Sequence, residues 1–132
     1  MKLTGIAATT NEMLGDERHM RFTVEEIALM ATQAVGCPVF VDFDRTPPPV
    51  GMVVGADVED GTKLRVVIEM AAAHPKLRAP LWPPSSKLYA VPGVTGSGEP
   101  PVFAVQKVTE FGITHKPADT STDLTPLVLE KP

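Results

Sequence analysis

The chain of 132 residues has one cysteine, Cys37, and few aromatic residues. A single cysteine excludes an intrachain disulfide and every zinc site built from several cysteines. This usage is compatible with a reducing compartment. With one tryptophan, one tyrosine and five phenylalanines, the core must be mostly aliphatic.

Clustered basic charge and long apolar runs are also missing. The formal net charge is −4, and the 12 Lys and Arg residues are scattered, whereas surfaces that bind nucleic acid or anionic lipid gather basic side chains. No apolar run approaches the roughly 20 residues that cross a bilayer, and residues 1–3 lead into polar sequence instead of a signal-peptide core. We therefore expect a soluble protein with no nucleic-acid partner, no membrane partner and no standard export signal.

Proline, by contrast, is abundant. The 14 prolines are about twice the usual share of roughly 5%. Because proline fixes φ and donates no backbone hydrogen bond, this number predicts long ordered connections outside any sheet. The length suits one domain. We place a single β-rich domain at residues 1–115 and an extended C-terminal tail at 116–132.

The clearest local signal is a helix at residues 24–35. Thr23 stands three residues before Glu26, the spacing of a capping box. Gly36 is suited to the left-handed residue that follows a helix. The apolar residues at helical spacing predict a buried stripe made of Ile27, Met30, Ala31, Ala34 and Val35.

Short apolar stretches predict the strands of a sheet. We expect them at residues 3–8, 39–43, 51–58, 62–70, 88–91, 102–108 and 110–115. The last two could form one strand with a bulge. Residues 9–21 are expected to form an exposed loop, and residues 92–101 a turn region rich in glycine and proline. The predicted fold class is α+β, a small β-barrel-like, mostly antiparallel sheet with one main helix.

The strands at 51–58 and 62–70 are predicted to form a hairpin. A two-residue turn would put apolar and charged side chains on the same face, so we favour a three-residue loop, 59–61, with Gly61 at positive φ. Val58 would then lie opposite Thr62. The same register sets Met52 opposite Ile68. The buried face of the second strand would consist of Leu64, Val66, Ile68 and Met70.

Side chains able to carry chemistry are sparse. His19, His74 and His115 have no second metal-type ligand at i+2 or i+4, so we expect no metal site and no cofactor. Cys37 follows a helix C-terminus, whose dipole disfavours a thiolate. We expect it to be a small packing residue instead of a nucleophile.

Other polar motifs have simpler structural interpretations. Residues 93–98 are rich in glycine but lack the lysine and the helix of a phosphate loop. Asp42 and Asp44 would point to one face of a strand and could form a carboxylate pair or bind a metal, although a solvated strand end explains them as well. Serines without a nucleophile elbow stand at Ser85, Ser86, Ser97 and Ser121.

Three short motifs occur in order along the chain: Asp42-Phe43-Asp44, Pro49-Val50-Gly51 and the segment 109–119. This order resembles the bacteriophage prohead maturation protease family, which shares its fold with the herpesvirus assembly proteases. In that family the corresponding motifs are Asn-His-Asp, Pro-Ile-Gly and a terminal Leu-X-Glu-Val-Ser-Leu-Val-Thr-X-Pro-Ala-Asn. The resemblance covers about residues 5–119 and implies a prohead-protease-like fold.

The chain departs from this family at the catalytic positions. Phe43 stands in place of the histidine, Glu110 matches a family glutamate, and Gly112 replaces the serine two residues later. The Ser-(Ile/Met)-Gly-Phe strand that carries the family nucleophile is absent from the sequence. A triad without its base and nucleophile loses nearly all of its acceleration. The resemblance therefore implies a degenerate site with no catalytic residues, in which the base position is used for packing.

The resemblance implies a non-enzymatic bacteriophage virion structural protein, a capsid decoration or cement protein, which is a minor capsid protein. Such a protein is made in the bacterial host cytoplasm and resides on the capsid surface of the virion. Its expected partners are the major capsid protein and itself, as a homo-oligomer. The candidate contact residues are apolar and lie in proline-flanked segments: Trp82, Pro83, Pro84, Leu124, Leu127, Val128 and Leu129.

Two other functions stay open at this point. One is an active or divergent prohead maturation serine protease with a relocated pair, His74 or His115 with Ser85 or Ser97. The other is a binding module for an unknown ligand, with a pocket in place of the protease cleft. Trp82 could equally fold back over the domain's own core.

Overall fold

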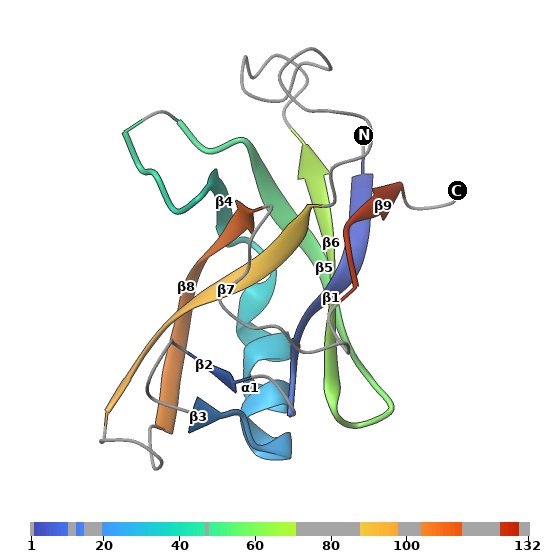
Figure 1. Ribbon diagram of the computed structural model, residues 1–132, viewed down its shortest axis with the longest axis vertical. Coiled ribbons are helices and arrows are strands. Elements are labelled where there is room, and N and C mark those ends of the chain that lie inside the picture. Colours follow the sequence, from blue (N-terminus) through green and yellow to red (C-terminus); the bar gives the residue numbers. More distant parts are fainter. Residues whose placement is uncertain are drawn as a thin grey trace.

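The computed structural model describes residues 2–10, 13–14, 20–46, 48–70, 88–97, 104–114 and 125–129. Its elements, in chain order, are β1 (Lys2–Thr9), β2 (Met13–Leu14), β3 (Met20–Arg21), α1 (Val24–Ala34), β4 (Pro38–Val41), β5 (Gly51–Glu59), β6 (Lys63–Met70), β7 (Tyr89–Ser97), β8 (Ala104–Thr114) and β9 (Val128–Leu129) (Figure 1).

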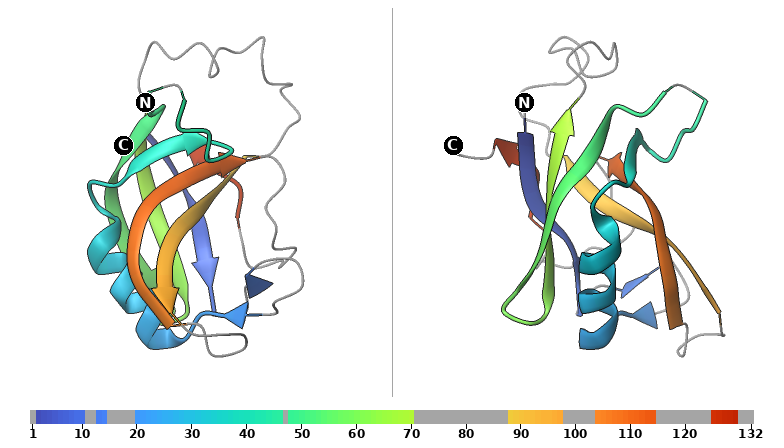
Figure 2. Two further views of the ribbon diagram at one scale, coloured as in Figure 1. Left: turned by 90° about the vertical axis from the view of Figure 1, so that its left-hand side faces the viewer. Right: turned by 180° about the vertical axis from the view of Figure 1, so that it is seen from behind.

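Seven strands form one sheet in the order β7-β8-β4-β5-β6-β1-β9, and β2 pairs separately with β3. Neighbouring strands are antiparallel except for the parallel pair β4 and β8. The sheet curls into a half-barrel (Figure 2), and its two edges approach where Leu127 N donates a hydrogen bond of 2.6 Å to Leu88 O. The predicted α+β class, with a curled and mostly antiparallel sheet and one main helix, is confirmed.

Helix α1 fills a gap that the short β4 leaves in the sheet. Only Pro38 and Val39 of β4 pair with β5, so β5 and β8 diverge beyond it and α1 lies between them, as the view from behind in Figure 2 shows. There Gln33 Oε1 accepts a hydrogen bond of 2.8 Å from Val108 N. The helix thereby satisfies a backbone donor of β8 on the side where no strand pairs with it.

The ends of α1 follow from local sequence. Thr23 Oγ1 accepts a hydrogen bond from Glu26 N at 3.1 Å, and Glu26 Oε1 accepts one from Thr23 N at 2.9 Å, which completes the predicted capping box. The helix ends at Ala34 because Val35 is extended, with φ −63° and ψ 129°, and Gly36 has a φ of +93°. Val35 was predicted to be buried, but it leaves the helical path and is 57% exposed.

The core lies between the concave face of the sheet and α1. It contains the residues predicted for β6 together with residues of α1, β4, β5 and β8: Leu64, Val66, Ile68, Met70, Ile27, Met30, Ala34, Val39, Val53, Phe111 and Ile113. Burial of each large aliphatic side chain stabilises the fold by about 1.5–3 kcal/mol. Among the described residues, no helix is long and apolar enough to cross a membrane.

The hairpin loop begins one residue later than predicted. Val58 pairs with Leu64 instead of Thr62, so the loop consists of Asp60, Gly61 and Thr62. Gly61 has the predicted positive φ, +72°, and Asp60 also has one, +55°. Two successive residues in the left-handed conformation reverse the chain direction within these three positions. Glu59, the residue before the loop, therefore stays paired with Lys63.

A β-bulge in β5 then changes the register again. The pairing shifts between Val53 and Gly55, so Val54 is the extra residue. The shifted loop alone would set Met52 opposite Met70, and the bulge brings it opposite Glu69, whereas Ile68 was the predicted partner. The prediction assumed a regular ladder, and a regular ladder has no place for the extra residue.

Strand β7 is much longer than predicted. It continues through Ser97, whereas residues 92–101 were expected to form a turn region. Pro92 is accommodated because β7 is an edge strand, and a backbone N–H that points away from the sheet there has no partner strand to bind. Strand β8 is a single strand with bulges, one of the two predicted alternatives. The predicted exposed loop at 9–21 contains the short pair of β2 and β3.

Candidate functional site

Strand β4 ends at Val41 in a tight turn, two residues before the predicted strand end. Asp42 and Phe43 have φ values of +49° and +58°, and Asp44 N donates a hydrogen bond of 2.9 Å to Val41 O. These features define a type I′ turn. Asp42 and Asp44 therefore do not share a strand face, which corrects that prediction. Asp44 Oδ1 instead accepts a hydrogen bond of 3.0 Å from Thr46 N and orders the loop.

Phe43 has a backbone conformation that bulky residues rarely adopt, at a cost of about 1–3 kcal/mol. Its ring packs directly on two glycines. A Cβ at Gly112 would lie 2.6 Å from Phe43 Cε2, and one at Gly93 would lie 3.2 Å from Phe43 Cε1. The ring occupies the space that side chains at these two positions would need, and this packing holds the strained turn in place.

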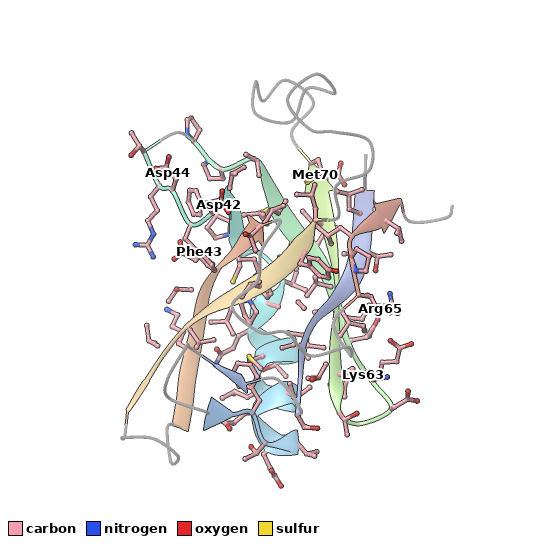
Figure 3. The ribbon with its side chains drawn as sticks, in the orientation of Figure 1. Asp42, Phe43, Asp44, Lys63, Arg65 and Met70 are labelled. Carbon is pink, nitrogen blue, oxygen red and sulfur yellow. The ribbon has the colours of Figure 1, made fainter. Side chains whose placement is uncertain are left out.

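The ring lies on the outer face of the sheet. Phe111 and Ile113 flank Gly112 in β8 and are fully buried in the core, so Gly112 faces away from the core. Figure 3 shows Phe43 against β8, with Asp42 and Asp44 in the loop beside it. Phe43 is 38% exposed, so one side of its ring contacts the sheet and the other contacts solvent.

Arg45 binds Glu110 next to this ring. Arg45 Nε donates a hydrogen bond of 2.8 Å to Glu110 Oε2, and Arg45 Nη2 donates another to Glu110 Oε1. The Glu110 side chain is only 9% exposed, whereas that of Arg45 is 66% exposed. The hydrogen bond to Glu110, followed by the Coulomb attraction to Glu110, raises the pKa of Arg45 above its ordinary value. The charge of the buried Glu110 carboxylate is thus balanced by an ion pair with two hydrogen bonds.

Glu110 also contacts the second glycine. A Cβ at Gly93 would lie 2.8 Å from Glu110 Cγ, because Gly93 and Glu110 are paired across β7 and β8. Aromatic ring, ion pair and glycines therefore form one contact network. We call this network the Phe43 cluster and define it as Phe43, Arg45, Gly93, Glu110 and Gly112.

Cys37 lies behind this region, on the core side, and is 8% exposed. Its Sγ donates weak hydrogen bonds to Gln33 O at 3.4 Å and to Val108 O at 3.7 Å. Burial raises the pKa of its thiol above the ordinary value of 9.0; the charge of Lys107 opposes this rise and that of Glu110 adds to it. The thiol is therefore protonated at neutral pH and is not activated as a nucleophile.

The structure brings together the three sequence positions that the resemblance assigned to a degenerate protease site, Phe43, Glu110 and Gly112. Within the described ranges there is no histidine, and no group of three or more His, Cys, Asp and Glu side chains could hold a metal ion. Several other predicted residues lie outside the described residues, namely His19, His74, His115, Trp82, Pro83, Pro84, Ser85, Ser86, Ser121 and Leu124.

The predicted tail contacts lie on the chain's own sheet. Val128 and Leu129 pair with β1, and Thr125 Oγ1 accepts a hydrogen bond of 2.7 Å from Ile6 N. Leu127 is half-buried against the core, whereas Val128 is 55% exposed. These residues were predicted to contact a partner protein, and in the structure the segment adds a strand to the edge of the chain's own sheet.

Sequence reasoning missed two members of the Phe43 cluster, Arg45 and Gly93. Arg45 is 65 residues away from its partner Glu110, and no local pattern marks a pair at that distance. Gly93 was assigned to a flexible turn because of its glycine-rich neighbours. A signal was present only in the pairing of β7 with β8, which the sequence alone does not supply.

Comparison of the chain with family models, with curated proteins and with solved structures finds no match. The likeness to prohead proteases therefore rests on the three sequence motifs.

Proposed function

We propose that this chain is a non-enzymatic bacteriophage virion structural protein, a capsid decoration or cement protein on a degenerate prohead-protease fold. It binds the major capsid protein on the outside of the assembled shell. The observation that carries the proposal is the packing of the Phe43 ring on Gly112 and Gly93, with Glu110 held by Arg45.

This cluster lacks the groups that peptide hydrolysis needs. A serine protease requires a base within hydrogen-bond reach of a nucleophile. The Phe43 side chain accepts no proton, Gly112 has no side chain, and both carboxylate oxygens of Glu110 accept hydrogen bonds from Arg45. The space above β8 is filled by an aromatic ring. These contacts support a binding role over a catalytic one.

The assignment to a capsid is supported by the order of the three motifs and by the kind of surface the fold presents. Several large apolar side chains are more than one-third exposed, among them Met52 at 49%, Val54 at 37% and Val128 at 55%. Met52 and Val54 line one groove, and neighbouring exposed apolar side chains of this kind mark surfaces that contact other proteins. Since a fold does not determine a function, the test must be made on capsids.

The direct test is co-sedimentation with capsids assembled from the major capsid protein of the same phage. The chain is expected to pellet with capsids in a saturable manner and to stay in the supernatant without them. Trp82→Ala should weaken this binding, and Trp82→Phe, which keeps an aromatic ring, should weaken it less. Absence of saturable binding by the folded chain would contradict the proposal.

A second test addresses the protease alternative. The chain should neither react with a fluorophosphonate probe nor cleave a capsid precursor. Phe43→His should not create either activity, because position 112 offers no nucleophile. Precursor cleavage that is abolished by His74→Ala or Ser85→Ala would instead establish the relocated protease.

A further inference from the structure

The side of the β5–β6 hairpin that faces away from α1 has an apolar end. Met52 is 49% exposed and Val54 is 37% exposed. Together they line an open groove of about 570 Å³, which we call the Met52 groove. Among the described residues, those that line it are Pro49, Gly51, Met52, Val54, Glu69 and Met70.

The β-bulge at Val54 produces this surface. Ala56 packs against the core, and in a regular strand Val54 would lie on the same side as Ala56. The extra residue reverses this alternation, so Val53 is buried while Met52 and Val54 are exposed. Both exposed side chains therefore line the Met52 groove.

Charged side chains also lie on this face, and they are paired across the strands with opposite signs. Lys2 Nζ lies 3.9 Å from Glu69 Oε2, and Arg65 Nη2 lies 2.9 Å from Glu59 Oε2. Figure 3 shows Lys63 and Arg65 on the side of β6 away from α1. The cross-strand register pairs are Lys2 with Glu69, Asp57 with Arg65 and Glu59 with Lys63.

These strands are thus electrically balanced within an acidic protein. The three basic and three acidic residues of β1, β5 and β6 sum to zero, whereas the whole chain has a net charge of −4. Two copies of an acidic chain repel each other over most of their surfaces. They can approach without net repulsion at a face where opposite charges alternate.

We propose that a second copy of this chain docks on this face, sheet against sheet, about a two-fold axis. Such an interface is self-complementary, since the same patch is used by both copies. Met52 of each copy enters the Met52 groove of the other, and Lys2 of each copy faces Glu69 of the other. The existing Lys2–Glu69 pair is long and both side chains are 53% exposed, so exchanging its partners loses little.

The first experiment measures the oligomeric state of the full chain by sedimentation velocity. A dimer with a micromolar Kd is populated well below about 200 μM, so the measurement covers concentrations up to that value, and we expect a dimer there. Val54→Glu should weaken dimerisation by at least about 100-fold, since two buried charges are introduced per dimer. Val24→Glu is the matched control: Val24 is 51% exposed at the start of α1, where an acidic residue is favourable, and dimerisation should be unchanged.

Either of two results would overturn the proposal. A wild-type chain that stays monomeric at every concentration, or a Val54→Glu variant that dimerises as tightly as the wild type, excludes this interface. Thermal melts of each variant ensure that a folded protein is compared. A monomeric chain that binds capsids would leave the proposed function standing and refute only the dimer.

A mixing experiment tests the occupant itself. Glu69→Lys gives a face with an excess of positive charge, and Lys2→Glu gives one with an excess of negative charge, so each variant alone should dimerise more weakly than the wild type. An equimolar mixture should form heterodimers, detected by native mass spectrometry, because each changed residue then meets an opposite charge. If the mixture forms no more dimer than the separate variants, the second copy does not occupy this face.

Discussion

Two regions on the outer side of the curled sheet, which we call the covered face and the open face, differ in how the chain covers them. Over β7 and β8, the loop after β4 places the Phe43 ring on the backbone and pairs Glu110 with Arg45. Over the start of β5 and the end of β6, Met52 and Val54 line an open groove instead. The Glu110 side chain is 9% exposed although it lies on an outer face, whereas Met52 is 49% exposed although it is apolar.

Some glycines of the two regions differ in how closely other atoms approach them. Gly112 and Gly93 are in such close contact with Phe43 and Glu110 that no side chain would fit. Gly55 has only an ordinary contact, with Val67 Cβ 3.5 Å from its would-be Cβ. Gly51 is an exception at the edge of the groove, since a Cβ there would lie 2.5 Å from Glu69 O, so the open space lies beside Met52 and Val54. Covered and open faces should respond differently to substitution.

The largest effect is expected at the centre of the covered face. Gly112→Ala puts a Cβ 2.6 Å from the Phe43 ring, and the forced displacement should lower the free energy of unfolding by about 1–3 kcal/mol, measured by urea denaturation.

The double variant Gly112→Ala/Phe43→Ala provides the control for this clash. It should be clearly more stable than the sum of the two single changes predicts, because removal of the ring relieves the clash. Additive single changes would show that the ring does not rest on Gly112.

Phe43→Ala tests the aromatic contact and the strained turn together. It should cost about 1–2 kcal/mol, less than a fully buried phenylalanine, because the ring is 38% exposed. Phe43→Gly loses the same ring but tolerates the φ of +58°, so we expect it to be more stable than Phe43→Ala by roughly 0.5–1 kcal/mol. The usual order, with alanine the more stable, would mean that the turn is not left-handed.

A third, smaller effect separates backbone strain from crowding on the open hairpin. Gly61→Ala should cost about 1 kcal/mol, because φ is +72° although nothing lies within 4 Å. Gly55→Ala is the matched control without positive φ, and it should change thermal stability by less than about 0.5 kcal/mol. Equal effects at Gly61 and Gly55 would show that the positive φ of Gly61 adds no strain.

The smallest effect is expected in the Met52 groove. At concentrations below dimerisation, Met52→Ala should lower stability by less than about 0.5 kcal/mol, since the side chain is half-exposed and the groove is open. A loss as large as that of Phe43→Ala, measured under the same conditions, would show that this face is as well packed as the other.

Local patterns were reliable where the contacts are local. The capping box joins Thr23 to Glu26, and both hydrogen bonds are present. The alternation along β6 predicted Leu64 and Ile68 as buried, because period 2 depends only on strand geometry. The same reasoning failed at Met52, which lies beyond the bulge that interrupts that period, and at Val35, where the chain leaves the helix one residue early.

Of the candidate site, the sequence supplied positions but not contacts. The motif order pointed to Phe43, Glu110 and Gly112, yet it gave no reason for the ring to lie outside the core or for Arg45 to bind Glu110. These contacts depend on the parallel pairing of β4 with β8, in which Val39 pairs with Phe111. Strands so far apart in the sequence pair only when the whole sheet has formed.

The sequence by itself determined the elements whose hydrogen bonds and side-chain contacts span a few residues: helix α1 with its cap, the left-handed Gly61 and the buried side of β6. The tertiary structure decided which surfaces are covered. It placed Phe43 on two glycines of other strands and returned Val128 and Leu129 to the edge of β1. The physical reason is that burial is a property of the assembled sheet, since a side chain loses its water only when residues distant in sequence close over it.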